Sequence, residues 1–495
     1  MSPVRPLVIA TLPARTVAAA REEAGIAARA GADLVEIRLD RWDDAERRRA
    51  GELFPLPLPA IATLRSRAEG GEGPDRSEER HPCLVAFAAL PFRFVDFELA
   101  RDGRPTGDEA AALRGRLLLS RHLTETLPGP ELRRTLGRAG GGAAFIKLVE
   151  PATAAQLLRD VLPYLPSPGG SGAIVHTTGG AGGLLRVWAA RLGLPAVFAS
   201  LPDEARTSPP LEASQIPCDR LAAFFSAAPP RALFAVVGRP IGFTRSPALH
   251  HRWMRALDRH GLYFPLEVAD EAELAALLPE LARGGFRGVN VTHPWKEAAL
   301  RLADRSAPDA DACGSANTLS FGPDGVEASN TDLAALLRRF TELRDAGPWD
   351  GRSVSILGTG GAARAALAAA RELGVPAQLY GRRPERVETL ARSFGASVGG
   401  SDRSGLVVHA TPSGRAGEAP MSIPWEPLLD PTVHVLDLVY APDDPWLARS
   451  ARAAGATYED GRRPLVYQAA ASFQRWWDVP VPEAEIAHAL AEVFG

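Results

Sequence analysis

The chain contains only two lysines, Lys147 and Lys296, among 56 lysine and arginine residues. Arginine carries positive charge but cannot lose its proton in a protein, whereas lysine can. A composition that has replaced nearly every lysine therefore predicts that these two lie where a reaction needs an amine. The alternative is chance retention on a solvated surface, which is the ordinary explanation for a lone lysine in an unbiased sequence.

Lys147 lies inside the apolar run AAFIKLV (143–149). Apolar surroundings disfavour a charged amine and lower its pKa, so Lys147 is a candidate Schiff-base nucleophile. His122 ends a neighbouring apolar run and can transfer protons near neutral pH. Three arginines could bind a carboxylate, at least one of them bidentately: Arg38, Arg65 and Arg186. These residue types indicate imine chemistry on an anionic carbonyl compound, and an aldolase, a transaldolase and a dehydratase all remain open.

A glycine-rich segment, GTGGAAR (358–364), follows the apolar run SVSIL and precedes an alanine-rich helical stretch. This arrangement is typical of a turn that brings backbone N–H groups to a pyrophosphate. The expected cofactor-binding residues are Gly358, Gly360, Gly361 and Ala362, together with Arg382, Arg383 and Arg386 after the next strand. Arginines stand where an NAD site would have an acidic residue, so a 2′-phosphate and hence NADP are favoured. For Arg383, a solvated position at a helix start is the alternative.

Eight apolar runs, each followed by a helical stretch or connection, must position the barrel residues: 7–12, 34–39, 60–65, 94–99, 117–122, 143–149, 172–178 and 196–201. Eight such units over about 220 residues predict a TIM (β/α)₈ barrel. Polar residues fall late in or at the ends of these runs: Glu36, Arg38, Arg65, Glu98, His122 and Lys147. Since active sites lie at the carboxyl ends of barrel strands, these residues are expected to converge there. The alternative is that they only mark where burial stops.

The pair Pro229-Pro230 predicts a short stiff linker, after which a new strand begins at Ala232. We expect three parts: a barrel over 1–226, a substrate-binding lobe over 232–333 that the helices of 463–495 complete, and a Rossmann-like lobe over 334–462. The segment 70–80 is expected to form a loop because glycine, proline and charged residues dominate it.

The first part resembles type I 3-dehydroquinate dehydratase in EIRLD (36–40), TLRS (63–66), the Ser120-x-His122 pair and the strand lysine Lys147. The resemblance implies that Lys147 forms an imine with 3-dehydroquinate and that His122 moves the protons. It further implies that Glu36, Arg38 and Arg65 line the pocket, that Arg186 binds the carboxylate, and that Gln215 belongs to the closing loop. The chain has Leu-Glu-Ala-Ser-Gln (211–215) where that loop usually reads Ser-Ala-Pro-Gly-Gln.

The second part resembles shikimate dehydrogenase in GVNVTHPWKEA (288–298), SANTL (315–319), SNTDL (329–333) and GRPIGFTRSPALHH (238–251). The resemblance implies a two-lobed enzyme in which Lys296 and Asp332 form the acid/base pair. The implied substrate-binding residues are Thr244, Ser246, Asn290, Thr292, Asn317, Tyr440 and Gln468. Three positions depart from the usual motifs: Thr244 replaces a serine, His409 an asparagine, and Arg463-Pro464 a Gly-Met pair.

The two resemblances predict a bifunctional enzyme that dehydrates 3-dehydroquinate and then reduces 3-dehydroshikimate to shikimate with NADPH, without a metal. A net charge of −3, three widely spaced cysteines and no membrane-length apolar run favour a cytoplasmic protein that binds neither nucleic acid nor membrane. A homodimer is one possible assembly. Two alternatives for the function stay open: an NAD-dependent quinate/shikimate dehydrogenase pairing, and a pseudoenzyme that senses the same metabolites.

Overall fold

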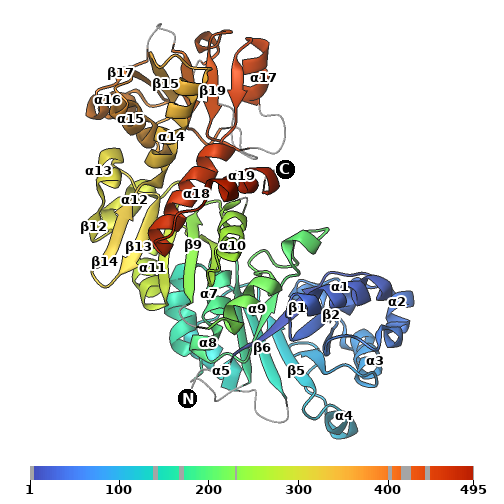
Figure 1. Ribbon diagram of the computed structural model, residues 1–495. Helices are drawn as coiled ribbons and strands as arrows, with labels where there is room; N and C mark the ends of the chain where they lie inside the picture. The colour runs from blue at the N-terminus through green and yellow to red at the C-terminus, as the bar shows by residue number, and fades with distance from the viewer. Residues whose placement is uncertain are drawn as a thin grey trace. The chain divides into compact units, whose positions relative to one another are not determined.

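The computed structural model describes residues 5–137, 143–166, 172–228, 231–242, 244–399, 404–413, 425–440 and 446–493 (Figure 1). The chain packs as two compact units. One comprises Met1–Ala232 with His260–Gly284, and the other comprises Leu233–Arg259 with Gly285–Gly495. The predicted linker Pro229-Pro230 lies outside the described residues.

Eight parallel strands form the sheet of the first unit, in the order β7-β6-β5-β4-β3-β2-β1-β8. They are β1 (Leu7–Leu12), β2 (Leu34–Arg38), β3 (Ala60–Thr63), β4 (Phe94–Glu98), β5 (Leu117–His122), β6 (Phe145–Pro151), β7 (Ala173–Thr178) and β8 (Ala196–Ala199). The helices of this part are α1 (Val17–Arg29), α2 (Asp44–Arg48), α3 (Ser77–Ala88), α4 (Gly107–Ala112), α5 (Gly129–Gly137), α6 (Ala154–Gln156), α7 (Gly182–Val187), α8 (Ala189–Leu192) and α9 (Cys218–Ser226). Each strand overlaps one of the eight predicted runs, so the predicted barrel is confirmed.

A histidine side chain bridges the two end strands of this ladder. His176 of β7 is 1% exposed, and its Nε2 accepts the backbone N–H of Phe198 on β8 at 3.1 Å. Burial holds the pKa of His176 well below its usual range, so the ring is neutral and can accept this hydrogen bond. The side chain thus makes a connection at the seam of the nearly closed barrel and fixes the position of Phe198.

The first unit also includes β10 (Gly261–Glu267) and α11 (Glu271–Arg283) from the second half of the sequence. Phe264 of β10 lies against Gly183 of α7, where a Cβ atom would collide with its ring. The Trp188 indole N–H donates to the Gly284 carbonyl at 3.0 Å. The buried carboxylate of Glu273 accepts the N–H of Ala155 at 2.8 Å and the N–H of Ala269 at 2.6 Å. Residues 260–284 therefore support the β6–α6 and β7–α7 regions of the barrel.

The second unit contains a mixed sheet whose strands β9, β11, β13, β14 and β12 are neighbours in that order. Its elements are β9 (Ala232–Gly238), α10 (Ser246–Ala256), β11 (Phe286–Val291), α12 (Lys296–Leu302), β12 (Arg305–Ser306), α13 (Pro308–Cys313), β13 (Thr318–Gly322), β14 (Gly325–Ser329) and α14 (Thr331–Ala346). β9 and β11 are parallel, whereas β13 is antiparallel to both β11 and β14.

A second sheet in this unit is entirely parallel, with the order β17-β16-β15-β18-β19-β20. Its elements, with the last two helices of the chain, are β15 (Val354–Leu357), α15 (Gly361–Glu372), β16 (Ala377–Tyr380), α16 (Pro384–Phe394), β17 (Ser397–Val398), β18 (Leu406–His409), β19 (His434–Asp437), α17 (Trp446–Ala453), β20 (Thr457–Glu459), α18 (Arg462–Trp477) and α19 (Glu483–Glu492). This strand order is that of the doubly wound dinucleotide-binding fold, in which ligands bind where the order reverses, here between β15 and β18.

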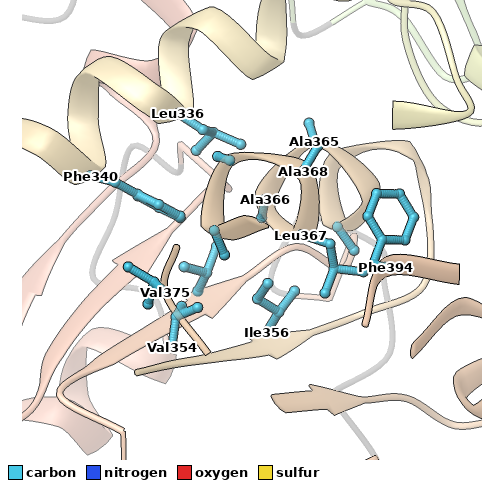
Figure 2. Close-up of a cluster of buried hydrophobic side chains, with 14 of the residues drawn as sticks. Leu336, Phe340, Val354, Ile356, Ala365, Ala366, Leu367, Ala368, Val375 and Phe394 are labelled. Carbon is cyan, nitrogen blue, oxygen red and sulfur yellow. The ribbon is translucent and has the colours of Figure 1, made fainter. Parts of the chain in front are cut away.

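Helix α15 is buried on nearly all sides because its residues are small. Figure 2 shows Leu336 and Phe340 of α14, and Val354 and Ile356 of β15, gathered around its alanines. Alanine favours helix and lets neighbouring backbones approach closely, so α15 can lie between α14 and the sheet. The N-terminus of α15 is thereby fixed beside the glycine-rich turn.

We expect Glu273→Ala to destabilise the first unit by about 2–4 kcal/mol, because two backbone N–H groups lose a charged acceptor that is itself buried. Denaturant unfolding measures this free energy. The control is Glu280→Ala on the same helix, which removes an ion pair to a largely exposed arginine, Arg283, and should cost less than about 1 kcal/mol. Equal effects of the two substitutions would contradict a supporting role for Glu273.

Candidate active sites

A cavity in the first unit contains all seven residues that the sequence predicts for a barrel site. They are Glu36, Arg38, Arg65, His122, Lys147, Arg186 and Gln215. The cavity is also lined by Thr11, Glu69, His176, Phe198 and Glu212, among others. Strand ends far apart in the sequence therefore converge as expected.

The amine of Lys147 is buried between a carboxylate and an aromatic ring. Lys147 is 5% exposed, and its Nζ lies 3.3 Å from Glu36 Oε1 and 3.6 Å from the centre of the Phe198 ring. Burial lowers the pKa of Lys147, and the neighbouring Glu36 offsets this effect only in part. An amine that loses its proton more readily is a better nucleophile at neutral pH.

Glu36 stays ionised although it is buried. Burial alone would raise the pKa of Glu36, but Lys147, Arg38 and Arg65 together lower it to about 2. The hydroxyl of Thr11 donates to its Oε2 at 2.9 Å, and that of Thr63 donates to its Oε1 at 3.1 Å. Three neighbouring strands, β1, β2 and β3, thus hold one carboxylate opposite the amine.

His122 faces the same cavity and contacts Glu69, a residue that the sequence analysis did not predict for the site. Glu69 Oε2 accepts the backbone N–H of His122 at 2.8 Å and lies 3.3 Å from its Nδ1. Burial lowers the pKa of His122 well below its usual range, which leaves the ring neutral and able to accept a proton. Burial raises the pKa of Glu69 to about 7, and the nearby Glu98 adds to this effect. The only sequence signal for Glu69 was its place on the connection after the third strand.

Each of the three predicted carboxylate-binding arginines has a protein carboxylate as its partner. Arg38 makes two 2.8 Å hydrogen bonds to Asp40. Arg65 is enclosed by carboxylates at 2.6, 2.9 and 3.3 Å, from Asp96, Glu98 and Glu69 respectively. Arg186 Nη2 donates to Glu212 Oε2 at 3.0 Å. Arg38 and Arg65 are therefore committed to a buried ionic network, whereas the partner of Arg186 lies on a surface loop.

That loop is the β8–α9 connection, which places Gln215 in the cavity as the sequence predicts. Gln215 Nε2 donates to the Thr11 hydroxyl at 3.3 Å. Ser214, one residue earlier, has its Oγ 3.0 Å from Arg186 Nη1 and donates to Glu212. Leu211 stands in the position of the usual serine, and the hydroxyl that reaches Arg186 comes from Ser214 instead.

A second cavity, in the other unit, contains all sixteen remaining predicted residues. Those of the substrate and acid/base group are Thr244, Ser246, Asn290, Thr292, Lys296, Asn317, Asp332, Tyr440 and Gln468, and those of the cofactor group are Gly358, Gly360, Gly361, Ala362, Arg382, Arg383 and Arg386. The cavity adjoins the glycine-rich turn after β15 and residues Ala410, Thr411 and Ser413 after β18, which is where the strand order reverses.

Lys296 and Asp332 form a close ion pair at the starts of α12 and α14, with Nζ 2.5 Å from Oδ2. Asn317 connects this pair to the rest of the site: its amide N–H group donates to Asp332 Oδ1 at 2.9 Å and to Gln468 Oε1 at 3.3 Å. Its side-chain oxygen, Oδ1, accepts the backbone N–H of Thr331 at 2.7 Å. Both charged side chains are 16% exposed, so they can be reached from the cavity.

The turn after β15 suits a dinucleotide phosphate. Gly358 has φ of 126°, a conformation that favours glycine, and a Cβ atom at Gly361 would collide with the side chain of Lys296. Helix α15, twelve residues long, begins at Gly361 and directs its N-terminal N–H groups toward this turn. These features fit a dinucleotide, with Arg382 and Arg383 on the same cavity wall.

Arg386 lies in the cavity wall but is paired with Glu297, the residue after Lys296. Glu297 also accepts from Arg364 of α15 at 3.2 Å. The expectation that Arg382 and Arg386 face one phosphate therefore requires Arg386 to leave Glu297 when the cofactor binds.

Two departures from the usual motifs lie at or close to this cavity. His409 is completely buried, with Nδ1 2.8 Å from Asp437 Oδ1 and Nε2 2.6 Å from the Thr411 hydroxyl. It therefore connects β19 to the loop that lines the cofactor side of the cavity. Pro464 lines the cavity at the start of α18, and Arg463 points to Glu459.

Within the described part of the chain, no group of three or more His, Cys, Asp or Glu side chains is placed to hold a metal ion. No described helix is long and apolar enough to cross a membrane.

Comparison with known proteins matches both halves of the chain. Residues 8–223 match the family model of type I 3-dehydroquinase, and residues 236–319 match that of the shikimate dehydrogenase substrate binding domain. A shikimate dehydrogenase (NADP(+)) of Acidiphilium cryptum is 38% identical over 271 residues, which cover 52% of this chain and 95% of the relative. One from Cereibacter sphaeroides (strain ATCC 17023) is 40% identical over 259 residues, 50% of this chain and 92% of the relative. A solved shikimate 5-dehydrogenase of Thermus thermophilus is 32% identical and aligns over 53% of this chain and 99% of its own, with a TM-score of 0.48.

The raised pKa of Glu69 predicts a pH-dependent cost to folding. Between about pH 4.5 and 7, the carboxyl group of Glu69 has lost its proton in the unfolded chain but retains it in the folded protein. The stability that Glu69 contributes therefore falls as pH rises. Glutamine does not titrate. As pH rises from about 4.5 to 7, the free energy of unfolding of Glu69→Gln should therefore increase by about 3 kcal/mol relative to that of the unmodified protein. Urea unfolding at several pH values measures the difference, and a difference that does not change with pH would contradict this assignment.

Proposed function

The chain belongs to the shikimate dehydrogenase family and also contains a type I 3-dehydroquinase domain, and we propose that it catalyses two consecutive reactions. The first dehydrates 3-dehydroquinate to 3-dehydroshikimate, and the second reduces 3-dehydroshikimate to shikimate with NADPH. The observation that carries the proposal is the placement of the only two lysines, one in each cavity and each beside a carboxylate. The product of the first reaction is the substrate of the second.

In the barrel, the neutral amine of Lys147 attacks the C3 ketone, and loss of water gives an imine. The imine withdraws electrons and acidifies the C2–H, whose proton passes to His122. His122 then returns the proton to the C1 hydroxyl, which leaves as water, and hydrolysis of the imine releases the product and the amine. The lowered pKa values of Lys147 and His122 support these roles, since both groups must be neutral at the start.

Glu36 and Glu69 each support one of the two reacting side chains. Glu36 is ionised and close to the amine, so it can stabilise the positive charge that develops on the imine nitrogen. Glu69 lies beside His122 and can stabilise the ring when it gains a proton. Arg186 is the proposed partner of the substrate carboxylate.

In the second cavity, Lys296 gives a proton to the oxygen of the carbonyl that is being reduced, and Asp332 orients its amine. NADPH, when bound, supplies the hydride. The glycine turn at 358–361 would hold its pyrophosphate and Arg382, Arg383 and Arg386 its 2′-phosphate. Asn290, Thr292, Asn317 and Gln468 would bind the substrate hydroxyls, with Thr244 and Ser246 at the carboxylate and Tyr440 beside the substrate.

The three-part division of the chain, a homodimeric state and a cytoplasmic location remain predictions. Three unpaired cysteines, two of them buried, support a reducing compartment. Light scattering of the purified protein measures the oligomeric state.

Lys147 should be trapped as a covalent adduct. Borohydride added with 3-dehydroquinate reduces the imine, so mass spectrometry should find the ligand mass on a peptide that contains Lys147. Lys147→Arg should lose dehydratase activity, since arginine keeps the charge but supplies no neutral amine. An unmodified peptide, or retained activity in Lys147→Arg, would overturn the imine.

The arginines after β16 should select NADPH over NADH. Each charge-assisted hydrogen bond contributes about 1.5–3 kcal/mol, which is roughly one to two decades in affinity. The double substitution Arg382→Ala, Arg386→Ala should raise the KM for NADPH by about 10²-fold or more and leave that for NADH little changed. Arg392→Ala, at the exposed far end of α16, is the control and should change neither. Equal losses for both cofactors would mean that these arginines do not bind the 2′-phosphate.

A further inference from the structure

The β8–α9 connection presents one carboxylate to the arginine that is proposed to bind the substrate. Its two ends are fixed to each other, because the carbonyl of Ser200 accepts the N–H of Cys218 at 2.9 Å and the N–H of Ser200 donates to the carbonyl of Ile216 at 3.2 Å. Between these ends, Glu212 Oε2 accepts from Arg186 Nη2 at 3.0 Å. Glu212 is therefore positioned by a loop whose base is held in place.

The carboxylate of Glu212 is itself oriented by the loop. Its Oε1 accepts the backbone N–H of Ser214 at 2.9 Å, and its Oε2 accepts the Ser214 hydroxyl. Gly182 of α7 permits this arrangement, since a Cβ atom there would collide with the hydroxyl of Ser214. The loop thus docks on α7 with Glu212 directed at the guanidinium.

The other two nitrogens of Arg186, Nε and Nη1, are hydrogen-bonded within the protein. Nε donates to the carbonyl of Phe198, and Nη1 donates to the carbonyls of Thr177 and Gly182 and to the Ser214 hydroxyl. Nη2 is the only nitrogen of Arg186 that is bonded to a carboxylate of the described residues. Arg186 is 2% exposed, so a second anion at this position would have to share one buried cation with Glu212.

We propose that Glu212 occupies the anion position on Arg186 in the substrate-free protein, and that the carboxylate of the substrate displaces it. This inference rests on the proposed dehydratase function. It makes Glu212 a determinant of substrate affinity: only the fraction of molecules in which Arg186 is released binds the anion, and the apparent dissociation constant rises by the inverse of that fraction. Displacement also frees the loop around Gln215 to rearrange when substrate enters.

The test is Glu212→Gln, which keeps the shape of the side chain but removes its charge. We expect the KM of the dehydratase for 3-dehydroquinate to fall about tenfold, equivalent to about 1.4 kcal/mol, with kcat changed less than the KM. Glu212→Asp keeps the charge on a shorter side chain and should give an intermediate KM. Glu204→Gln is the control, because it removes the same charge from an exposed position of the same connection and should leave the KM unchanged.

A binding measurement separates affinity from turnover. Calorimetric titration of Lys147→Ala with 3-dehydroquinate gives a dissociation constant without imine formation. Adding Glu212→Gln to this variant should lower the constant about tenfold. An unchanged or raised constant, with the fold intact by circular dichroism, would overturn the proposal. If the unmodified protein did not dehydrate 3-dehydroquinate at all, the proposed function would fail instead.

Discussion

The dehydratase cavity depends on the balance of charge around one buried amine. Lys147 is nearly inaccessible to water, so the cost of charging it must be offset by the protein, and Glu36 is the carboxylate that does so. If nearby negative charge stabilised the ammonium form too strongly, the amine would stay protonated and unreactive. If it stabilised that form too weakly, the charged amine would destabilise the barrel. The arginines near Glu36 hold that carboxylate ionised while they oppose the charge on Lys147, so the amine stays less basic than a free lysine.

The same cations explain why so many carboxylates surround the barrel mouth. Arg65 carries a full positive charge in a buried position and is satisfied only because Asp96 and Glu98 lie beside it. Burial and the nearby Glu98 raise the pKa of Glu69 to about 7, although Arg65 lies beside it. In the second cavity the charged lysine is stabilised in another way. Lys296 and Asp332 form an ion pair that is partly exposed, and Asn317 orients Asp332.

The sequence predicted those features that local patterns determine. The runs at 7–12 and 117–122 coincide with β1 and β5, and the parallel order of the barrel brought the predicted residues to one cavity. Patterns could not reveal which charged groups pair across the fold. Glu69 lies in a polar connection, and Glu212 and Glu297 lie inside motifs without a predicted role of their own. Only the folded chain places them against His122, Arg186 and Arg386. The packing of residues 260–284 with the barrel was equally hidden, because it depends on how Phe264 and Trp188 fit their surroundings rather than on periodicity.

One chain is proposed to carry both activities in separate cavities, and a coupled assay measures the two activities together. Purified protein is given 3-dehydroquinate and NADPH, and NADPH oxidation is followed for the unmodified chain, for His122→Ala and for Lys296→Ala. We predict that the unmodified chain oxidises NADPH. His122→Ala should oxidise NADPH only when 3-dehydroshikimate is supplied, and a mixture of the two variants should oxidise it from 3-dehydroquinate at the full rate. The two-cavity assignment would be wrong if the unmodified chain oxidised no NADPH, if it used NADH as readily as NADPH, or if the mixed variants did not complement each other.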